Sequence, residues 1–167
     1  CLQSVYASRG SCTFEVCVVD NASSDGSADM VAAEFPQATL IANEENVGYP
    51  TANNQGLRAF GFRQRPSDGR RAEAPRFALL LNSDTEIPAD ALQTMINFMG
   101  RHGEAGAVGP KLVRPDGSLD LACRRSFPTP EVSFYRMTGL SRLFPDSRRF
   151  GRYNLTYLDA DELAEVD

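Results

Sequence analysis

The sequence predicts an α/β fold with a mostly parallel sheet and helices on both of its faces. Two observations support this. Short apolar runs alternate with segments of helical periodicity, and two of these runs end directly in polar clusters. With 167 residues, 42% hydrophobic and 23% charged, the composition is that of one ordinary globular domain. No apolar run approaches the ~20 residues of a membrane-spanning helix.

The first part of the chain predicts two strand–helix pairs. Residues 13–20 hold a nearly continuous apolar run that ends on an aspartate, as expected of a strand covered on both faces. Turn residues precede residues 27–35 and Pro36 follows them, which predicts a helix there. Residues 38–42 predict a second short strand, and a proline at the start of residues 50–60 suits the first turn of a second helix.

The second part predicts one more pair and then a smaller, irregular region. After a basic connection at residues 61–76, the most apolar segment, 77–81, predicts a third strand. Pro88 opens a helix with apolar residues at i, i+3, i+4 and i+7, and Ala107-Val108 predict a short strand. Residues 111–119 predict a pair of short strands around a Pro-Asp-Gly turn, and 131–143 are predicted to be helical.

Charge and cysteine content disfavour several classes of function. The net charge is −5, and residues 159–167 carry five acidic and no basic residues. Because the rest of the chain is balanced, bulk charge gives no support to nucleic-acid binding. The four cysteines form no Cys-x-x-Cys pair and there is one histidine, so no zinc site is expected. Free thiols suit a reducing, cytoplasmic compartment.

Polar clusters follow two of the predicted strands, Asp20-Asn21 with the turn after it and Asn82-Ser-Asp84. Because the carboxyl ends of parallel strands share one sheet edge, the clusters are expected to converge on one ligand. Their oxygen atoms suit Mg²⁺ or Mn²⁺, which would also take oxygens from a substrate diphosphate. Two simpler interpretations stay open: the first cluster is a turn with a serine cap, and the second caps the helix near Pro88.

Four segments, in this order and spacing, resemble family 2 glycosyltransferases. They are Val18-Val-Asp-Asn-Ala-Ser-Ser-Asp-Gly-Ser27, Asn46-Val-Gly-Tyr49 with Asn53 and Gly56, Leu79-Leu-Leu-Asn-Ser-Asp-Thr85, and Val108-Gly-Pro-Lys-Leu-Val-Arg-Pro-Asp-Gly-Ser118 followed by Cys123-Arg-Arg-Ser-Phe-Pro128. The last segment is similar to the rhamnosyltransferase-like branch. The resemblance implies a GT-A type fold with a Rossmann-like half that binds a nucleotide-sugar.

The resemblance also implies roles for individual residues. A nucleotide-binding role is implied for Asp20, Asn21, Asp25, Asn46, Gly48, Asn53, Asn82 and Ser83. Asp84 matches the last aspartate of the family's Asp-x-Asp motif and would hold the Mg²⁺ or Mn²⁺, whereas Asn82 stands in place of the first aspartate. Lys111, Arg124 and Arg125 would contact phosphate or acceptor charge, or are simply surface charge.

The same resemblance predicts how the chain is divided. Residues 1–167 would be a single glycosyltransferase domain trimmed at both ends, with a nucleotide-sugar-binding core at 12–109 and the start of an acceptor-side region at 110–167. The family's first strand is expected before Cys1 and its general base beyond Asp167. No catalytic residue is therefore assigned, and this fragment alone is expected to be inactive.

The predicted activity is metal-assisted, inverting transfer of a sugar from a nucleotide-diphosphate donor, such as dTDP-rhamnose, to a surface-glycan or lipid-linked acceptor. The setting implied is bacterial cell-wall or polysaccharide synthesis in the cytoplasm, including the inner face of the plasma membrane, with no nucleic-acid partner. Two alternatives stay open. One is a nucleotidyltransferase with a similar sheet, and the other is a non-catalytic nucleotide-binding module of glycan assembly.

Overall fold

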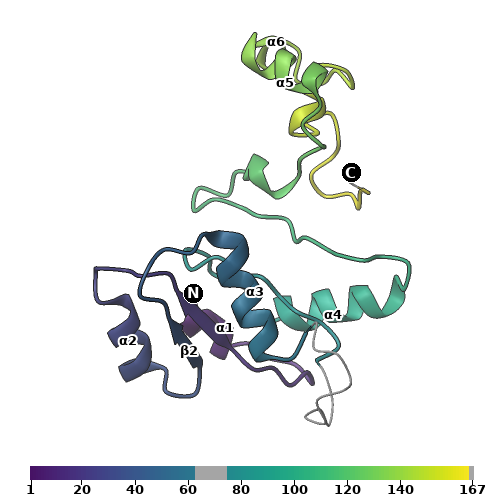
Figure 1. Ribbon diagram of the computed structural model, residues 1–167. Coiled ribbons are helices and arrows are strands. Elements are labelled where there is room, and N and C mark those ends of the chain that lie inside the picture. Colours follow the sequence, from purple (N-terminus) through teal and green to yellow (C-terminus); the bar gives the residue numbers. More distant parts are fainter. Residues whose placement is uncertain (63–74, 166–167) are drawn as a thin grey trace. The chain divides into compact units, whose positions relative to one another are not determined.

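The computed structural model describes residues 1–62 and 75–165 (Figure 1). The chain forms two compact units, Cys1–Arg101 and His102–Asp167, called unit 1 and unit 2 below. The boundary between them lies close to the predicted division between 12–109 and 110–167, whose functional meaning stays a prediction. Most of the predicted basic connection at 61–76 lies outside the described residues.

Unit 1 contains the strand–helix alternation. Its elements are α1 (Leu2–Tyr6), β1 (Cys17–Asp20), α2 (Ser27–Glu34), β2 (Thr39–Ala42), α3 (Tyr49–Ala59) and α4 (Ala91–Arg101). The strands predicted at 13–20 and 38–42 and the helices predicted at 27–35 and 50–60 are confirmed, although β1 starts later than predicted. A proline in the first turn of α3 fits there because its missing N–H has no helical partner at that position.

The two strands pair in parallel, and their register determines which loops meet. Cys17 lies opposite Thr39 and Asp20 lies opposite Ala42. Both strands therefore end at the same edge of the sheet, so the loops at 21–26 and 43–48 leave from one place.

Helices α2 and α3 pack against the two strands (Figure 1). A Cβ added to Gly56 of α3 would lie 3.4 Å from Val19 Cγ2 and 3.8 Å from Cys17 Sγ, so the glycine allows α3 to lie close to this strand face. On α2, Val31 is buried. The ring of Tyr6 stacks on that of Phe35 at 6.0 Å between centroids, and burial raises the Tyr6 pKa.

The sheet is smaller than predicted. In the described residues it has two strands, and neither residues 77–81 nor Ala107-Val108 pair with a neighbour. Leu79 and Leu80 are about half exposed. An apolar, strand-favouring sequence becomes a strand only where another strand offers hydrogen bonds, and no strand in the described part of the chain pairs with residues 77–81. The helix predicted from Pro88 begins at Ala91.

Unit 2 is built mainly from short helices. They are η2 (Leu121–Cys123), α5 (Pro130–Met137), α6 (Leu140–Leu143) and η3 (Gly151–Tyr153). The predicted pair of strands at 111–119 is reduced to one antiparallel bridge, between Val113 and Leu119. The helix predicted at 131–143 is interrupted at Gly139, whose φ of 79° is left-handed, and so becomes α5 and α6. None of the helices in the described parts of the chain has the length and hydrophobicity required to cross a bilayer.

Candidate functional site

The candidate site lies where β1 and β2 end. Asp20, the last residue of β1, is 9% exposed, and its Oδ2 accepts a hydrogen bond from the Ser23 backbone N–H at 3.0 Å. This bond turns the chain sharply and offsets part of the cost of burying a carboxylate. Among residues 1–62 and 75–165, none donates a hydrogen bond to the other oxygen of the Asp20 carboxylate, Oδ1. The turn passes through Ala22 at a φ of 65°.

Two asparagines join the loops that follow the strands. Asn21 Nδ2 donates to Asn46 Oδ1 at 2.7 Å, and Asn21 Oδ1 accepts from the Val47 backbone N–H at 3.0 Å. Asn46 Oδ1 also accepts from the Gly48 backbone N–H at 2.9 Å. The structure thus brings together three residues that the sequence predicted for nucleotide binding. Here Asn21 and Asn46 shape the loops.

A second amide pair extends this network and was missed by the sequence analysis. Asn43 and Gln55 exchange two hydrogen bonds, each 2.9 Å long, between β2's end and α3. Asn43 Nδ2 also reaches Asn21 Oδ1 at 3.4 Å. The available signal was an asparagine directly after a predicted strand, the same position that Asn21 has after β1.

The backbone conformation at position 48 requires a glycine. Its φ of 81° and ψ of 153° lie in a region that only glycine adopts without strain, and a Cβ placed there would meet no atom within 4 Å. The residue precedes α3 and leaves open space beside the joined loops. Asn53, in the first turns of α3, donates its side-chain N–H to the Tyr49 carbonyl at 2.9 Å.

Asp25 stabilises the turn that leads into α2. Its Oδ1 accepts hydrogen bonds from the Ser27 backbone N–H at 3.0 Å and the Ser27 hydroxyl at 2.6 Å, and these bonds lower the Asp25 pKa. A carboxylate at this place also interacts favourably with the positive end of the helix dipole. These are the contacts of a turn that starts a helix, so the nucleotide-binding role predicted for Asp25 stays a prediction.

The predicted metal ligand lies on an exposed turn. The Asn82 carbonyl accepts a hydrogen bond from the Thr85 hydroxyl at 2.7 Å. The side chains of Ser83 and Asp84 are exposed to solvent. Because α4 begins only at Ala91, the turn does not supply that helix's cap. In the described residues no group of three or more His, Cys, Asp or Glu side chains is arranged to hold a metal.

The donor chemistry of this turn nevertheless fits a hard divalent cation. Mg²⁺ at nucleotide sites is commonly held by one or two carboxylates, with water and substrate phosphates completing its shell. Asp84 offers one exposed carboxylate, and Asn82 offers an amide oxygen. The turn therefore has the donors expected for a cation that is bound together with a diphosphate.

The three basic residues predicted for phosphate or acceptor contact lie in unit 2. Lys111 Nζ forms an ion pair with Asp161 at 2.6 Å, which lowers the Asp161 pKa. The Arg124 guanidinium donates to the Leu158 and Asp159 carbonyls, both at 2.8 Å. The Arg125 guanidinium lies 5.9 Å from the ring centroid of Tyr153. Lys111 and Arg124 thus hold the 158–161 segment in place, and a ligand role for the three stays a prediction.

The sequence matches glycosyl transferase family 2 over residues 1–162. The chain belongs to this family. Membership confirms the resemblance drawn from the four motifs, and it implies a GT-A fold. The α/β character and parallel strands of unit 1 agree with that fold.

Two curated relatives carry the same name, N-acetylglucosaminyl-diphospho-decaprenol L-rhamnosyltransferase, from the CDC 1551 / Oshkosh and ATCC 25618 / H37Rv strains of Mycobacterium tuberculosis. Each is 26% identical over 110 residues, which is 66% of this chain and 35% of the relative. The aligned chain thus spans about a third of the length of these relatives. No solved structure is significantly similar.

Proposed function

We propose that this chain is the donor-binding part of an inverting glycosyltransferase that uses a nucleotide-diphosphate sugar. The observation that carries the proposal is the joining of the two polar loops at one sheet edge by the bond between Asn21 and Asn46. Ligands of parallel sheets bind beyond this edge. Family membership favours sugar transfer over the nucleotidyltransferase alternative.

The residues of this edge have separate proposed roles. Asp20, whose Oδ2 shapes the turn, offers its Oδ1 to the nucleoside. Asn21 and Asn46 keep the loops in shape, and Gly48 and Asn53 would lie beside the bound nucleotide. Further nucleotide contacts are proposed for Asp25, Asn82 and Ser83. The loops are preorganised by side-chain bonds, so little conformational entropy is lost when a nucleotide binds.

Asp84, with Asn82, would hold a Mg²⁺ or Mn²⁺ ion. When bound, such a cation supplies positive charge that stabilises the negative charge developing on a diphosphate leaving group. The exposed position of Asp84 leaves room for phosphate oxygens and water. The inverting reaction also needs a general base for the acceptor hydroxyl, and none is assigned in this chain.

The donor and acceptor are proposed from the relatives. Because they are named as rhamnosyltransferases acting on a diphospho-decaprenol acceptor, we propose a rhamnose donor, such as dTDP-rhamnose, and a lipid-linked acceptor for this protein. Such an acceptor is anchored in a bilayer, so the proposed location of the enzyme is the inner face of the plasma membrane. Cell-wall or surface-polysaccharide synthesis in a bacterium is the corresponding setting.

Isothermal titration calorimetry with dTDP, UDP and GDP, each with and without Mn²⁺, tests this proposal. At least one diphosphate is expected to bind in a Mn²⁺-dependent way. Asp84→Ala is expected to weaken that binding at least about tenfold, because one carboxylate is a large share of the metal's protein ligands. Asp146→Ala, an exposed carboxylate of unit 2, is the matched control and is expected to bind as the wild type does.

Three results would contradict parts of the proposal. Unchanged binding in Asp84→Ala would show that the metal assignment is wrong. Equal binding with and without Mn²⁺ would favour the non-catalytic nucleotide-binding module. A folded wild-type chain that binds none of the three nucleotides would show that this chain is not a donor-binding part.

A further inference from the structure

An exposed apolar surface lies on α5 and α6. Four large side chains within eleven residues are mostly in solvent, and we call them the α5–α6 patch. They are Phe134 at 57% exposed, Met137 at 87%, Leu143 at 72% and Phe144 at 52%. Phe134 and Met137 are three residues apart and so lie on one side of α5. Single exposed apolar residues are ordinary, but a cluster of this kind marks an interaction surface.

The opposite side of α5 is packed, so Phe134 and Met137 lie on the outer face of a folded helix. Val132 and Tyr135 of α5 are buried. The Tyr135 ring meets the Phe150 ring edge-on at 4.9 Å between centroids. Thr129 caps α5 by accepting the Val132 N–H at 3.3 Å. Because α5 has both a cap and a packed face, the helix does not need its outer face covered to fold.

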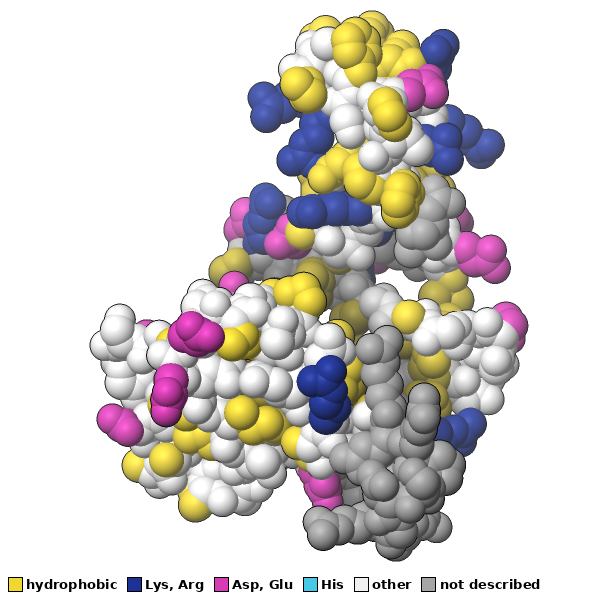
Figure 2. All heavy atoms as spheres, viewed as in Figure 1, with side chains coloured by type: hydrophobic (Ala, Val, Ile, Leu, Met, Phe, Trp, Pro, Cys, Tyr) yellow, Lys and Arg dark blue, Asp and Glu magenta, His cyan; other side chains and the backbone are white. Residues whose placement is uncertain are grey.

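The sequence around the α5–α6 patch is rich in arginine. Residues 124–152 contain seven arginines and two acidic residues, a net charge of +5, whereas the rest of the chain is net acidic. The seven are Arg124, Arg125, Arg136, Arg142, Arg148, Arg149 and Arg152. Figure 2 shows hydrophobic side chains gathered over α5 and α6 with basic side chains on both sides of them. The basic segment and the apolar patch thus occupy the same part of unit 2.

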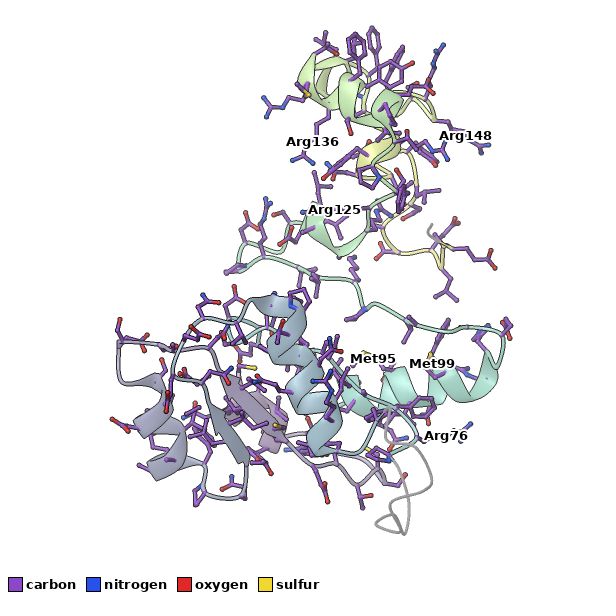
Figure 3. All side chains as sticks on the ribbon, in the orientation of Figure 1. Arg76, Met95, Met99, Arg125, Arg136 and Arg148 are labelled. Atoms are coloured by element: carbon purple, nitrogen blue, oxygen red, sulfur yellow. The ribbon has the colours of Figure 1, made fainter. Side chains whose placement is uncertain are left out.

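Several of these arginines are held at the surface by neighbouring rings. The Arg136 guanidinium lies 4.0 Å from the Tyr153 ring centroid, and that of Arg149 lies 5.5 Å from Tyr135. Arg149 also pairs with Glu131, one of the two acidic residues, at 3.2 Å. Figure 3 shows Arg125, Arg136 and Arg148 extending outward from the ribbon of unit 2. The positive charge is therefore presented to the outside.

We propose that the α5–α6 patch and its arginines dock on the surface of an anionic lipid bilayer. The apolar side chains would enter the boundary between headgroups and acyl chains, while the guanidinium groups lie beside lipid phosphates. Arginine suits this place because its stem is apolar and its planar head forms paired bonds with phosphate. The inference rests on the proposed function for its setting, since a lipid-linked acceptor would lie in that bilayer.

The net positive charge and the apolar side chains together favour an anionic bilayer over a second copy of the chain or a nucleic acid as the partner of the patch. In a symmetric dimer through this face, two segments of net charge +5 would lie against each other, and like charges repel. A nucleic acid would match the charge but not the apolar centre formed by side chains such as Met137 and Leu143. An anionic bilayer matches both features.

Vesicle sedimentation of the 167-residue chain tests the proposal. Vesicles of phosphatidylcholine mixed with phosphatidylglycerol are expected to bind the chain at least about tenfold more tightly than phosphatidylcholine alone, because each nearby arginine adds about a factor of five. The double variant Met137→Ser/Leu143→Ser is expected to weaken binding at least about tenfold. Both side chains are so exposed that their replacement leaves the fold intact, which circular dichroism verifies.

Matched control variants distinguish vesicle binding through the α5–α6 patch from nonspecific adsorption of the chain. Leu163→Ser removes an equally exposed leucine, 79% in solvent, from the acidic tail and is expected to bind like the wild type. Arg148→Glu is expected to weaken binding about tenfold, whereas Arg9→Glu, an exposed arginine of unit 1, is expected to change it little. Equal effects of the patch and control variants would overturn the proposal, as would equal binding to both kinds of vesicle.

Two further readouts keep the outcomes distinct. Light scattering that shows a dimer in the wild type and a monomer in Met137→Ser/Leu143→Ser would place a second copy on this face and overturn bilayer docking. Nucleotide titration of the same variants separates this inference from the proposed function. Vesicle binding that persists when no nucleotide binds would support the docking surface and contradict only the donor-binding role.

Discussion

In unit 1, the polar side chains at the sheet edge bond to one another and to backbone amides, as Asn21 does with Asn46 and Val47. In unit 2, the arginines stack on rings at the surface or bond to carbonyls, as Arg136 does on Tyr153 and Arg124 with Leu158. The first arrangement uses side chains to set loop shape. The second places positive charge around the exposed apolar side chains of α5 and α6.

This difference indicates two kinds of recognition within one chain. Loops held by hydrogen bonds between side-chain amides provide a small, rigid binding site, which suits a nucleotide. Exposed guanidinium groups around an apolar patch suit an extended, charged surface. The three predictions that follow test this division.

The largest effect is expected from placing a carboxylate in one core at a time. Val31 in unit 1 is 5% exposed and Val132 in unit 2 is 4% exposed. An unpaired charge at either position is expected to cost at least about 3 kcal/mol. Hydrogen-exchange mass spectrometry is expected to show that Val31→Asp removes protection within unit 1 and Val132→Asp within unit 2. Val113→Asp, at a valine 59% exposed, is the matched control.

Loss of protection in both units from either core variant would contradict the expectation that unit 1 and unit 2 unfold independently of each other.

A smaller effect is expected at the joined loops. Asn21→Ala leaves the Val47 N–H without its acceptor and removes one of the two hydrogen bonds to Asn46 Oδ1, which is expected to lower the stability of unit 1 by about 1–2 kcal/mol. Nucleotide affinity should fall with it, because the loops lose their fixed shape. Urea unfolding and calorimetry measure the two effects. Asn54→Ala, in α3, is the control and is expected to be nearly neutral. A stable variant with unchanged affinity would show that the Asn21 bonds do not shape the site.

The smallest effect is expected at the ion pair of unit 2. Hydrogen bonds from Tyr135 and Arg149 lower the Glu131 pKa. A lowered carboxylate pKa stabilises the folded state at pH above the unfolded value and loses this effect as pH falls through the folded value. Glu131→Gln is therefore expected to lower the melting temperature slightly at pH 7, and the difference should shrink progressively as the pH falls below about 4. Glu162→Gln, in the acidic tail, is the control. A difference that persists in acid would point to packing instead of charge.

Local pattern was sufficient for most elements of unit 1. The apolar run that ends at Asp20, the Pro36 stop and the Pro50 start each act within a few residues, so the corresponding elements were predicted correctly. The third strand was wrong because a strand at residues 77–81 depends on a neighbour that the sequence pattern does not specify. The interruption of the helix at Gly139 was missed although its signal is local, because a glycine with a left-handed φ commonly follows the last turn of a helix.

For the candidate site too, some residues could be predicted from the sequence, whereas the contacts between distant segments could not. Asp20 and Asp84 could be proposed from their places after predicted strands, and Asn46 and Gly48 from the family resemblance, which the family match confirms. The exchange of bonds between Asn43 and Gln55 could not be predicted, because it depends on how α3 lies relative to β2. Nor could the sequence show that Arg124 would be bonded to the carbonyls of residues 158 and 159.

The sequence by itself determined the family, the α/β alternation and the acidic and amide side chains at the strand ends, because these follow from residue type and short spacing. Tertiary structure alone decided that the two loops are joined through Asn21, that residues 77–81 pair with no other described residue and that the side chains of the α5–α6 patch are exposed. The physical reason is that hydrogen bonds and burial depend on which distant segments meet, and the free energy of those contacts does not follow from local pattern.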